Sequence, residues 1–247
     1  MKNKPYFLQE ACNLVYPQLM LVNNNTTSSC LFQVAGTGTL LVTYVVASQK
    51  VQNTYQMNET ATTIQVPAGG TQINLVGDIA SFQSILNVYM LVADKSSIED
   101  VMITSTMESL SITRCHAPLS ISGGLNPAIG QLALRECAGI HTISLNSVAR
   151  IDIVNCFNIT DVYLGVHEQT APTPAITISG KTSINNIIYA GSYVVDYTKL
   201  KEAIIALIES STVESGYIDC TELNTANVNV EELKEIVTTY GWDIDIA

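Results

Sequence analysis

The feature that most constrains this chain is an internal repeat of the pattern apolar-x-apolar-x-x-Cys. The pattern occurs at Leu110–Cys115, Leu132–Cys137 and Ile151–Cys156, and the segments after Cys137 and Cys156 also match each other at every apolar position. A unit of about 20 residues cannot bury a hydrophobic core alone, so neighbouring copies must stack against each other. The repeat therefore predicts a stack of similar coils in the middle of the chain.

Each copy offers two short strands whose apolar-x-apolar residues are expected to point inward. Neighbouring copies would then pair their backbones in parallel, and Cys115, Cys137 and Cys156 would occupy narrow corners where a small apolar side chain packs. A fourth, degenerate copy carries Lys181 in place of the cysteine. Chance spacing in a β protein rich in Val, Ile and Leu is the alternative, which the matched columns after Cys137 and Cys156 make improbable.

The regions beside the repeat have different patterns. Several strand-like segments with turn signals between them predict an antiparallel β-sandwich over 28–95. Residues 1–27 combine a semi-apolar lead with a polar run, which indicates a docking segment and a linker. Apolar residues at helical spacing, alternating with strand-like segments, predict an α/β cap over 192–247 that covers the open edge of the last coil. The stack itself is assigned to 96–191.

Composition excludes several classes of protein. Only 13% of the residues are charged and the net charge is −11, whereas soluble domains carry about 25% charged residues. Disordered chains have few apolar and many charged residues, which is not the case here. Nucleic-acid binding needs clustered Lys and Arg, and an acidic chain disfavours it. No apolar run reaches the ~18 residues that a membrane-spanning helix needs, so no membrane insertion is expected. The six cysteines lack C-x-x-C spacing and are expected to be free, buried thiols.

Catalytic patterns are missing from the sequence. There is no H-E-x-x-H motif, no P-loop and no G-x-S-x-G elbow. The three histidines, His116, His141 and His167, are far apart in sequence and are interpreted as turn residues rather than metal ligands. We therefore expect no enzyme activity, no cofactor and no metal ion.

Residues 140–166 resemble the BspA-type leucine-rich repeat of Bacteroidetes and their phages. The resemblance rests on Asn155-Cys156 at the corner and on the segment from Ile159 to Leu164, and it extends over about 98–190. Two weaker similarities flank it. The segment 71–79 is similar to the last strand of the sandwich domains that precede such repeats, and 216–220 with 240–243 is similar to their closing unit. The expected fold is mainly β: an N-terminal β-sandwich, a leucine-rich-repeat-like β-solenoid and a C-terminal α/β cap.

This resemblance implies a non-enzymatic structural protein of a phage virion, in a fibre, tail or capsid-decorating role. Residues 1–22 would dock onto other virion proteins, and the chain is expected to form a homo-oligomer. The binding surface for a host protein or glycan would be the outward face of the repeat, at Arg135, Asn146, Asp152 and Tyr163, with Tyr163 beside the two charged residues.

The N-terminal sequence indicates where the protein is located. Gln9, Glu10, Asn13 and Pro17 interrupt the apolar run that a signal peptide needs, so assembly in the host cytoplasm is expected. A bacterial cell-surface adhesin of the same repeat family is the alternative, and a carbohydrate-degrading spike is a further one.

Overall fold

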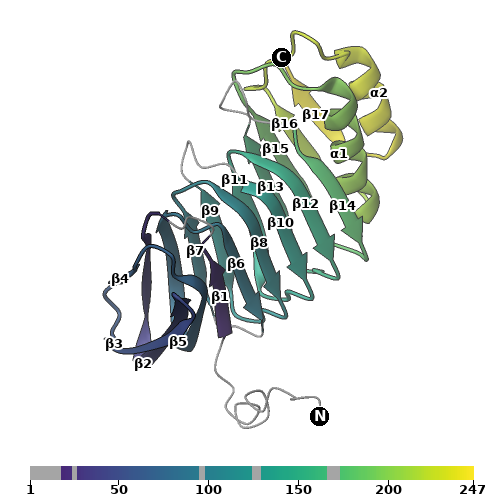
Figure 1. The fold of residues 1–247 in the computed structure, drawn as a ribbon. Coiled ribbons are helices and arrows are strands. Elements are labelled where there is room, and N and C mark those ends of the chain that lie inside the picture. Colours follow the sequence, from purple (N-terminus) through teal and green to yellow (C-terminus); the bar gives the residue numbers. More distant parts are fainter. Residues whose placement is uncertain (1–17, 24–26, 95–97, 124–128, 166–172) are drawn as a thin grey trace, which may run out of the picture.

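The computed structural model describes residues 18–23, 27–94, 98–123, 129–165 and 173–247. Most of the segment predicted to dock, 1–17, lies outside the described residues, as do Cys12 and His167. The described chain is mainly β, and its strands join in one large mixed sheet that does not close on itself (Figure 1). Neither helix of the described residues has the length and apolar character that crossing a membrane requires.

Two parallel ladders run along the repeat. Ladder A contains the strand that precedes each cysteine corner, and its members pair in the order β6 (Met90–Asp94), β8 (Met107–Thr113), β10 (Ile129–Arg135), β12 (Val148–Val154) and β14 (Ala175–Ser179). Ladder B contains the second strand of each coil, in the order β7 (Asp100–Ile103), β9 (Leu119–Gly123), β11 (Ile140–Leu145), β13 (Asp161–Gly165), β15 (Asn186–Ala190), β16 (Tyr217–Cys220) and β17 (Asp243–Ile246).

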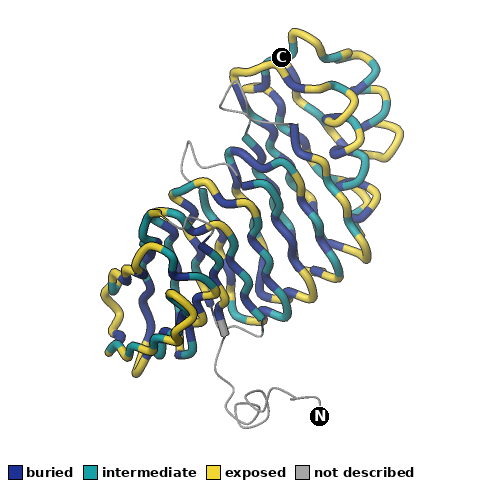
Figure 2. The backbone as a smooth tube through the Cα atoms, viewed as in Figure 1, coloured by how far each residue is buried: buried dark blue, intermediate teal, exposed yellow. Residues whose placement is uncertain are grey.

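Within each ladder the strands pair in register, so each apolar position of one coil lies beside the equivalent position of the next coil. Leu132 pairs with both Leu110 and Ile151, and all three side chains are at most 1% exposed. Successive strand residues point to opposite faces, so one face of each ladder is apolar and one is polar. The inward side chains of both ladders belong to one core cluster, and buried positions run along the whole molecule in Figure 2.

Each strand of the repeat in ladder A ends in a left-handed corner. Arg114, Glu136 and Asn155 each have a φ of 54°, and Gly180 has a φ of 96° at the equivalent position of the fourth copy. Left-handed backbone is unfavourable for most side chains, and only Asn and Gly adopt it readily. At Arg114 and Glu136 the corner is therefore fixed by the stack rather than by local preference. The parallel hydrogen bonding continues through the corner, for example from Glu136 N to Val154 O.

The N-terminal part of the structure is antiparallel and is dominated by two long strands. These are β2 (Cys30–Val46) and β5 (Thr71–Leu86), with β3 (Gln49–Met57) and β4 (Thr62–Val66) beside β2. The sequence predicted only short strands here, because turn-forming residues interrupt each long strand. Gly36 marks a bend of β2 where the backbone of β5 passes so closely that an added Cβ would lie 2.0 Å from the carbonyl oxygen of Asp78.

These long strands connect the antiparallel part to both ladders. The first half of β5 pairs with β1 (Gln18–Val22), which pairs with β6 of ladder A, and the second half of β5 pairs with β7 of ladder B. The predicted boundary between 28–95 and 96–191 therefore falls inside a continuous network of paired strands. Moreover, β6 lies on the N-terminal side of that boundary and already belongs to the parallel stack.

β1 corrects one sequence-based expectation. Residues 18–22 were expected to dock onto another chain, but they form a strand paired on both sides, and Leu19 and Leu21 are at most 1% exposed. Their alternation with Met20 is the period of a half-buried strand. These residues thus belong to the core of the fold.

The two predicted helices are present at the C-terminal end, α1 (Tyr197–Ser210) between β15 and β16 and α2 (Val230–Thr239) between β16 and β17. Asp196 caps α1 by accepting from Lys199 N at 3.2 Å, and Asn229 caps α2 by accepting from Glu232 N at 3.3 Å. α1 packs on β14 and α2 packs on β17, so the helices cover the last strands of both ladders (Figure 1).

The burial of β1 gives a direct test. We expect Leu21→Ala to lower the free energy of unfolding by ~2–5 kcal/mol, because the change leaves a cavity in the core. The matched control Met20→Ala, on the exposed face of the same strand, should change it by less than ~0.5 kcal/mol. Chemical denaturation measures both values, and equal effects of the two changes would place β1 outside the core.

Tyr189 gives a second test. Its ring is fully buried in β15, and its hydroxyl has no hydrogen-bond partner among the described residues. Tyr189→Phe should therefore raise the free energy of unfolding by ~1 kcal/mol, because it removes an unsatisfied buried polar group. Tyr44→Phe is the control. It should lower the free energy of unfolding instead, because Tyr44 Oη accepts a hydrogen bond from Asn53 Nδ2 at 3.4 Å. A loss of stability in Tyr189→Phe would show that this hydroxyl is hydrogen-bonded.

Candidate binding surface

The four residues that the sequence assigned to one binding face lie on both ladders. Arg135 and Asp152 are on ladder A, in β10 and β12, whereas Tyr163 is on ladder B, in β13, and Asn146 directly follows β11. Strand β12 pairs with β10 and β14, while β13 pairs with β11 and β15. The expected grouping of Tyr163 beside Arg135 and Asp152 is therefore corrected, because the shared core separates the two outward surfaces.

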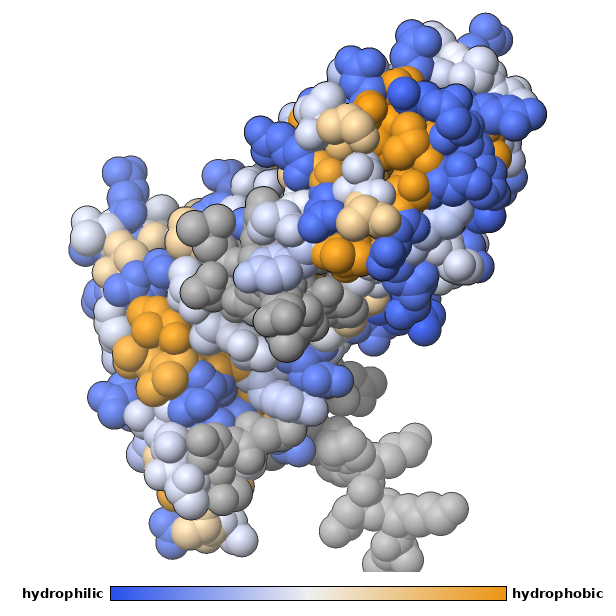
Figure 3. All heavy atoms as spheres, turned by 90° about the horizontal axis from the view of Figure 1, so that it is seen from above, coloured by the Kyte–Doolittle hydropathy of each residue, from blue (hydrophilic) through white to orange (hydrophobic). Residues whose placement is uncertain are grey.

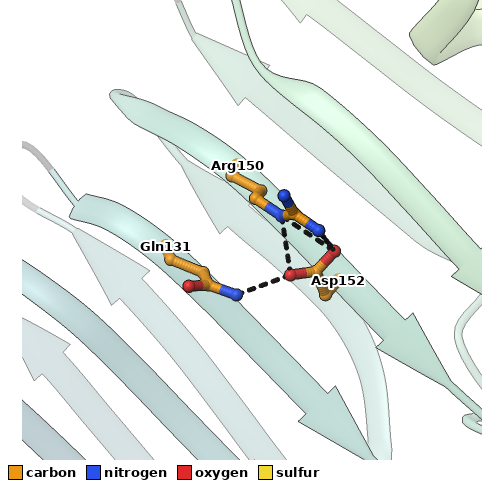
Figure 4. A network of polar contacts seen from close by, with 3 residues as sticks. All are labelled: Gln131, Arg150 and Asp152. Atoms are coloured by element: carbon orange, nitrogen blue, oxygen red, sulfur yellow. Dashed lines mark hydrogen bonds and ion pairs between the residues drawn. The ribbon is translucent and has the colours of Figure 1, made fainter.

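Two ion pairs join charged side chains on the outward face of ladder A. Asp152 accepts from Arg150 Nε at 2.8 Å and from Arg150 Nη2 at 3.0 Å (Figure 4). Gln131, from the neighbouring strand β10, donates to the same carboxylate at 2.6 Å. The side chain of Asp152 is 14% exposed against 56% for Arg150, so the carboxylate is the more buried of the two groups.

These contacts set the charge state of Asp152. The hydrogen bonds from Arg150 hold the pKa of the Asp152 carboxyl below its usual value against the opposing effect of burial, and Gln131 adds to the lowering. A second ion pair on this ladder joins Arg114 to Asp94, with Arg114 Nε donating to Asp94 Oδ1 at 2.9 Å. Ladder A thus satisfies these charges internally, and Arg135 is exposed at the end of its strand.

The outward face of ladder B has a different composition, and we call it the ladder B face. Its residues form two columns in register across the strands, one of Ser81, Asp100, Ser120, Thr142, Asp161, Asn186, Tyr217 and Asp243, the other of Gln83, Met102, Ser122, Ser144, Tyr163, Ile188, Asp219 and Asp245. The columns contain five aspartates and no lysine or arginine. This face is therefore acidic and rich in hydroxyl groups.

A shallow hollow of about 620 Å³ lies on the ladder B face over β9 and β11. Its floor includes Ser120, Ser122, Thr142 and Ser144, and residues such as Glu99 and His141 also line it. The hollow exists because the outward residues of these two strands are small. Larger outward side chains stand on the flanking strands, with Met102 on β7 and Tyr163 on β13 as register partners of the floor.

Two aspartates flank the hollow, and Asp161 is held in a fixed position. Asp161 accepts from Asn186 Nδ2 at 2.9 Å and from Thr160 Oγ1 at 2.7 Å. Asp100, on the other flank, has a pKa raised by burial. Further along the same face, Tyr217 donates its hydroxyl to Asp245 at 2.7 Å, which raises the pKa of Tyr217 to about 12. The hollow therefore offers rotatable hydroxyls, and the flanking strand β13 adds a fixed acceptor, Asp161, and one half-buried aromatic ring, Tyr163.

Sequence reasoning found part of this surface. It placed Tyr163 outward, and Tyr163 is outward, but it did not identify Ser120, Thr142 and Asp161 as part of this surface. The available signal was the hydroxyl residue between apolar positions in the second strand of successive coils. That signal was weak in the copy after Cys115, where only Leu119 and Ile121 match. Asn146 is half-buried and engaged in a contact within the fold.

The corner cysteines are buried as the packing argument required. Cys115, Cys137 and Cys156 are 0% exposed, and all five cysteines of the described residues are free thiols. Burial raises the pKa of the isolated thiols of Cys30 and Cys220 to about 12. No described residues form a group of three or more His, Cys, Asp or Glu placed to hold a metal ion, and His116 and His141 are both exposed.

Comparison with known proteins adds no assignment: no family model, no curated protein and no solved structure matches this chain. The surface must therefore be interpreted from its own chemistry. Figure 3 shows hydrophobic side chains gathered in separate patches toward the two ends, among hydrophilic ones. That view thus displays no single continuous apolar surface.

The Asp152 contacts predict a pH dependence. A carboxyl whose pKa is lowered by folding adds stability that is present above its unfolded-state pKa, near 3.9, and is lost as the pH falls through the folded-state value. We expect Asp152→Asn to lower the free energy of unfolding at pH 7 by ~0.5–1 kcal/mol, because Arg150 is largely exposed. The difference from the natural chain should disappear as the pH is lowered from about 4 towards 2.

Urea denaturation over this pH range measures the difference, with Glu59→Gln on an exposed turn as the control. If the stability difference between Asp152→Asn and the natural chain stays constant down to pH 2, packing rather than the charge of Asp152 accounts for the loss of stability.

Proposed function

We propose that this chain is a non-enzymatic structural protein of a phage virion, in a fibre, tail or capsid-decorating position, that binds a host surface glycan or protein through the ladder B face. The observation that carries this proposal is the contrast between the two outward faces. Ladder A pairs Arg150 with Asp152 and Arg114 with Asp94. The columns of ladder B hold five aspartates without a basic side chain among them, and two of these, Asp100 and Asp161, are on the strands that flank a hollow with a hydroxyl floor.

The two ladders are then the two strand rows of a leucine-rich-repeat-like β-solenoid. The strands β2 to β5 are its preceding β-sandwich, and 192–247 is its α/β cap. The in-register pairing of successive coils and the repeated left-handed corners support this assignment. Repeat architectures of this kind use an extended surface for recognition, because identical positions of successive coils form continuous columns.

The chemistry of the hollow and of the flanking strand β13 fits a glycan. Ser120, Thr142 and Ser144 can each donate and accept a hydrogen bond, and the Asp161 carboxylate accepts from hydroxyl groups. Tyr163, beside Ser144 in register, presents an aromatic ring with a polar hydroxyl at its tip. A sugar chain combines hydroxyl groups with apolar ring faces, so it can use both kinds of contact at once.

A hydrolytic role has less support. Asp219 and Asp245 are register partners on neighbouring strands, so two carboxylates do approach each other on the ladder B face. Sugar hydrolysis needs one carboxyl with a raised pKa as the acid. The backbone and side chain of Thr221 instead hold the pKa of Asp219 below its usual value. Asp219 is therefore better suited to accepting hydrogen bonds than to donating a proton, and Asp100, whose pKa burial raises, is on β7, away from this pair on β16 and β17.

A bacterial cell-surface adhesin remains the alternative role for the same surface. The two roles differ in where the protein is found: on particles assembled in the host cytoplasm or on the surface of the cell. Genes for capsid and portal proteins beside the gene for this chain would decide for the virion.

The binding proposal is tested by Tyr163→Ala. We expect the labelled chain to bind intact cells of at least one strain in a panel of Bacteroidetes, with competition by the isolated surface polysaccharide of that strain. Tyr163→Ala should weaken this binding by about tenfold or more, as loss of an aromatic anchor does. Its melting temperature should remain nearly unchanged, because Tyr163 is on the outward face.

The matched control is Val154→Ala, a half-buried outward residue of ladder A, which should leave binding unchanged. Equal loss of binding in both variants, or no binding to any strain, would contradict the proposal. Release of reducing sugar from the polysaccharide would instead establish the degrading spike.

A further inference from the structure

The two ends of the stack differ in how the described residues cover them. At the C-terminal end, α1 and α2 pack on the last strands of the two ladders. At the opposite end, β3 and β4 each pair with β2, and no other described strand pairs with either of them (Figure 1). Stacked repeats need a cap at each end, because an open edge exposes backbone groups that another strand can pair with. The N-terminal edge is therefore the place where the stack can be extended.

β3 is a long and regular edge strand. Its nine residues, Gln49–Met57, pair with β2 without a register shift, and they include no proline and one charged residue, Lys50. Protected edges are instead short, bulged or rich in charge. β3 can therefore accept a further strand without a change in its own backbone.

A two-residue turn fixes which backbone groups of β3 face the open side. Ala47 and Ser48 both have positive φ, as a type I′ turn requires, and the turn joins the paired residues Val46 and Gln49. Such a turn closes on a hydrogen-bonded pair, so the odd-numbered residues from Gln49 to Met57 direct their N–H and C=O groups toward β2. The even-numbered residues between them direct these groups to the open side.

The inward side chains at this edge are incompletely covered. Val51 and Tyr55 pack against the core but are only half-buried. On the neighbouring strand β2, Leu40 and Val42 are 0% exposed. A strand added beside β3 would cover the sides of Val51 and Tyr55 that β2 does not reach. The edge thus offers a partner both backbone groups and apolar side chains.

The charge distribution favours a second copy of the chain as that partner. The net charge is −11, so two copies repel each other unless they meet where few charges lie. The segment 30–86, which contains β2 to β5, has three charged side chains, Lys50, Glu59 and Asp78. The region 192–247, at the opposite end, has 11 acidic and 3 basic residues. The β3 end is therefore where two copies can approach with the least repulsion.

We propose that two copies of this chain form a symmetric dimer through antiparallel pairing of their β3 strands. In a dimer with two-fold symmetry the same surface is used by both copies. The register that uses all of Gln49–Met57 places the middle residue, Asn53, on the two-fold axis. Each copy then covers the open edge of the other, and the sheet continues from one copy into the next.

This register agrees with the backbone directions and the side chains of β3. Gln52 lies opposite Thr54 of the second copy, so residues whose backbone groups face the open side pair with each other. Val51 lies opposite Tyr55 of the second copy, which is a favourable cross-strand pair of a β-branched and an aromatic residue. Lys50 lies opposite an uncharged side chain, so no like charges meet.

The dimer has a consequence for binding. It carries two ladder B faces, and a cell surface displays many copies of its glycan. Once one face is bound, the second binds at a raised effective concentration, so the dimer holds the surface more tightly than one chain does. This consequence rests on the proposed function, whereas the pairing of β3 does not.

The mass of the full-length chain in solution tests the pairing. We expect light scattering to give twice the chain mass of 26.7 kDa. Thr54→Pro should raise the dissociation constant of the dimer at least tenfold, because proline removes an N–H group on the open side. The variant should keep its fold, since proline is tolerated on edge strands where the N–H faces away from the sheet. The matched control Thr54→Val keeps the N–H group and should remain a dimer.

Cross-linking through introduced cysteines tests the register. Asn53 lies opposite itself in a non-hydrogen-bonded pair, whose Cα atoms are about 4.5 Å apart, and a disulfide spans roughly 4.4–6.8 Å. Asn53→Cys should therefore give a covalent dimer with oxidised glutathione on a non-reducing gel. Gln52→Cys, which does not lie opposite itself, should not, and neither should the natural chain.

Three results would overturn the proposal: a natural chain that stays monomeric at high concentration, a Thr54→Pro variant that dimerises as tightly as Thr54→Val, or equal cross-linking of Gln52→Cys and Asn53→Cys. Another occupant of the edge, such as a different protein or residues 1–17 of the same chain, would give the first of these results. The dimer is measured without glycan, so its failure and a failure of glycan binding are separate results.

Discussion

The structure depends on parallel, in-register pairing between successive coils. Because this pairing places each residue beside its counterpart in the next coil, the inward or outward direction of a position is common to its whole column. Leu110, Leu132 and Ile151 are therefore buried together, and the corner residues Arg114 and Glu136 share one unfavourable backbone conformation. The column, rather than the single residue, is the unit on which packing acts.

Sequence reasoning succeeded where this column rule applies. The apolar alternation predicted the inward residues of the repeat and the buried corner cysteines, and the helical period predicted both C-terminal helices. It failed on β1, whose short alternation of Leu19, Met20 and Leu21 was read as a docking segment. It also divided β2 and β5 into short strands, because a bend at Gly36 resembles a turn when the partner strand is unknown.

The candidate site shows the same limit. A coil has two strands, and residues close in sequence lie on different strands when a corner separates them. Asp152 and Tyr163 are eleven positions apart with the Cys156 corner between them, so they face opposite sides of the core. The alternation fixes which residues point outward, but only the pairing of strands shows which of them share a face. That pairing divides the surface into a face with paired charges and an acidic face with a hydroxyl-lined hollow.

Hydroxyl-radical footprinting tests most directly the proposed binding of the host ligand to the ladder B face. Met102 on ladder B and Met20 on β1, beside ladder A, are 38% and 37% exposed, so they start from equal accessibility. Binding of the surface polysaccharide should slow the oxidation of Met102 and Tyr163 and leave that of Met20 unchanged. Slower oxidation of Met20, with Met102 unaffected, would contradict the account.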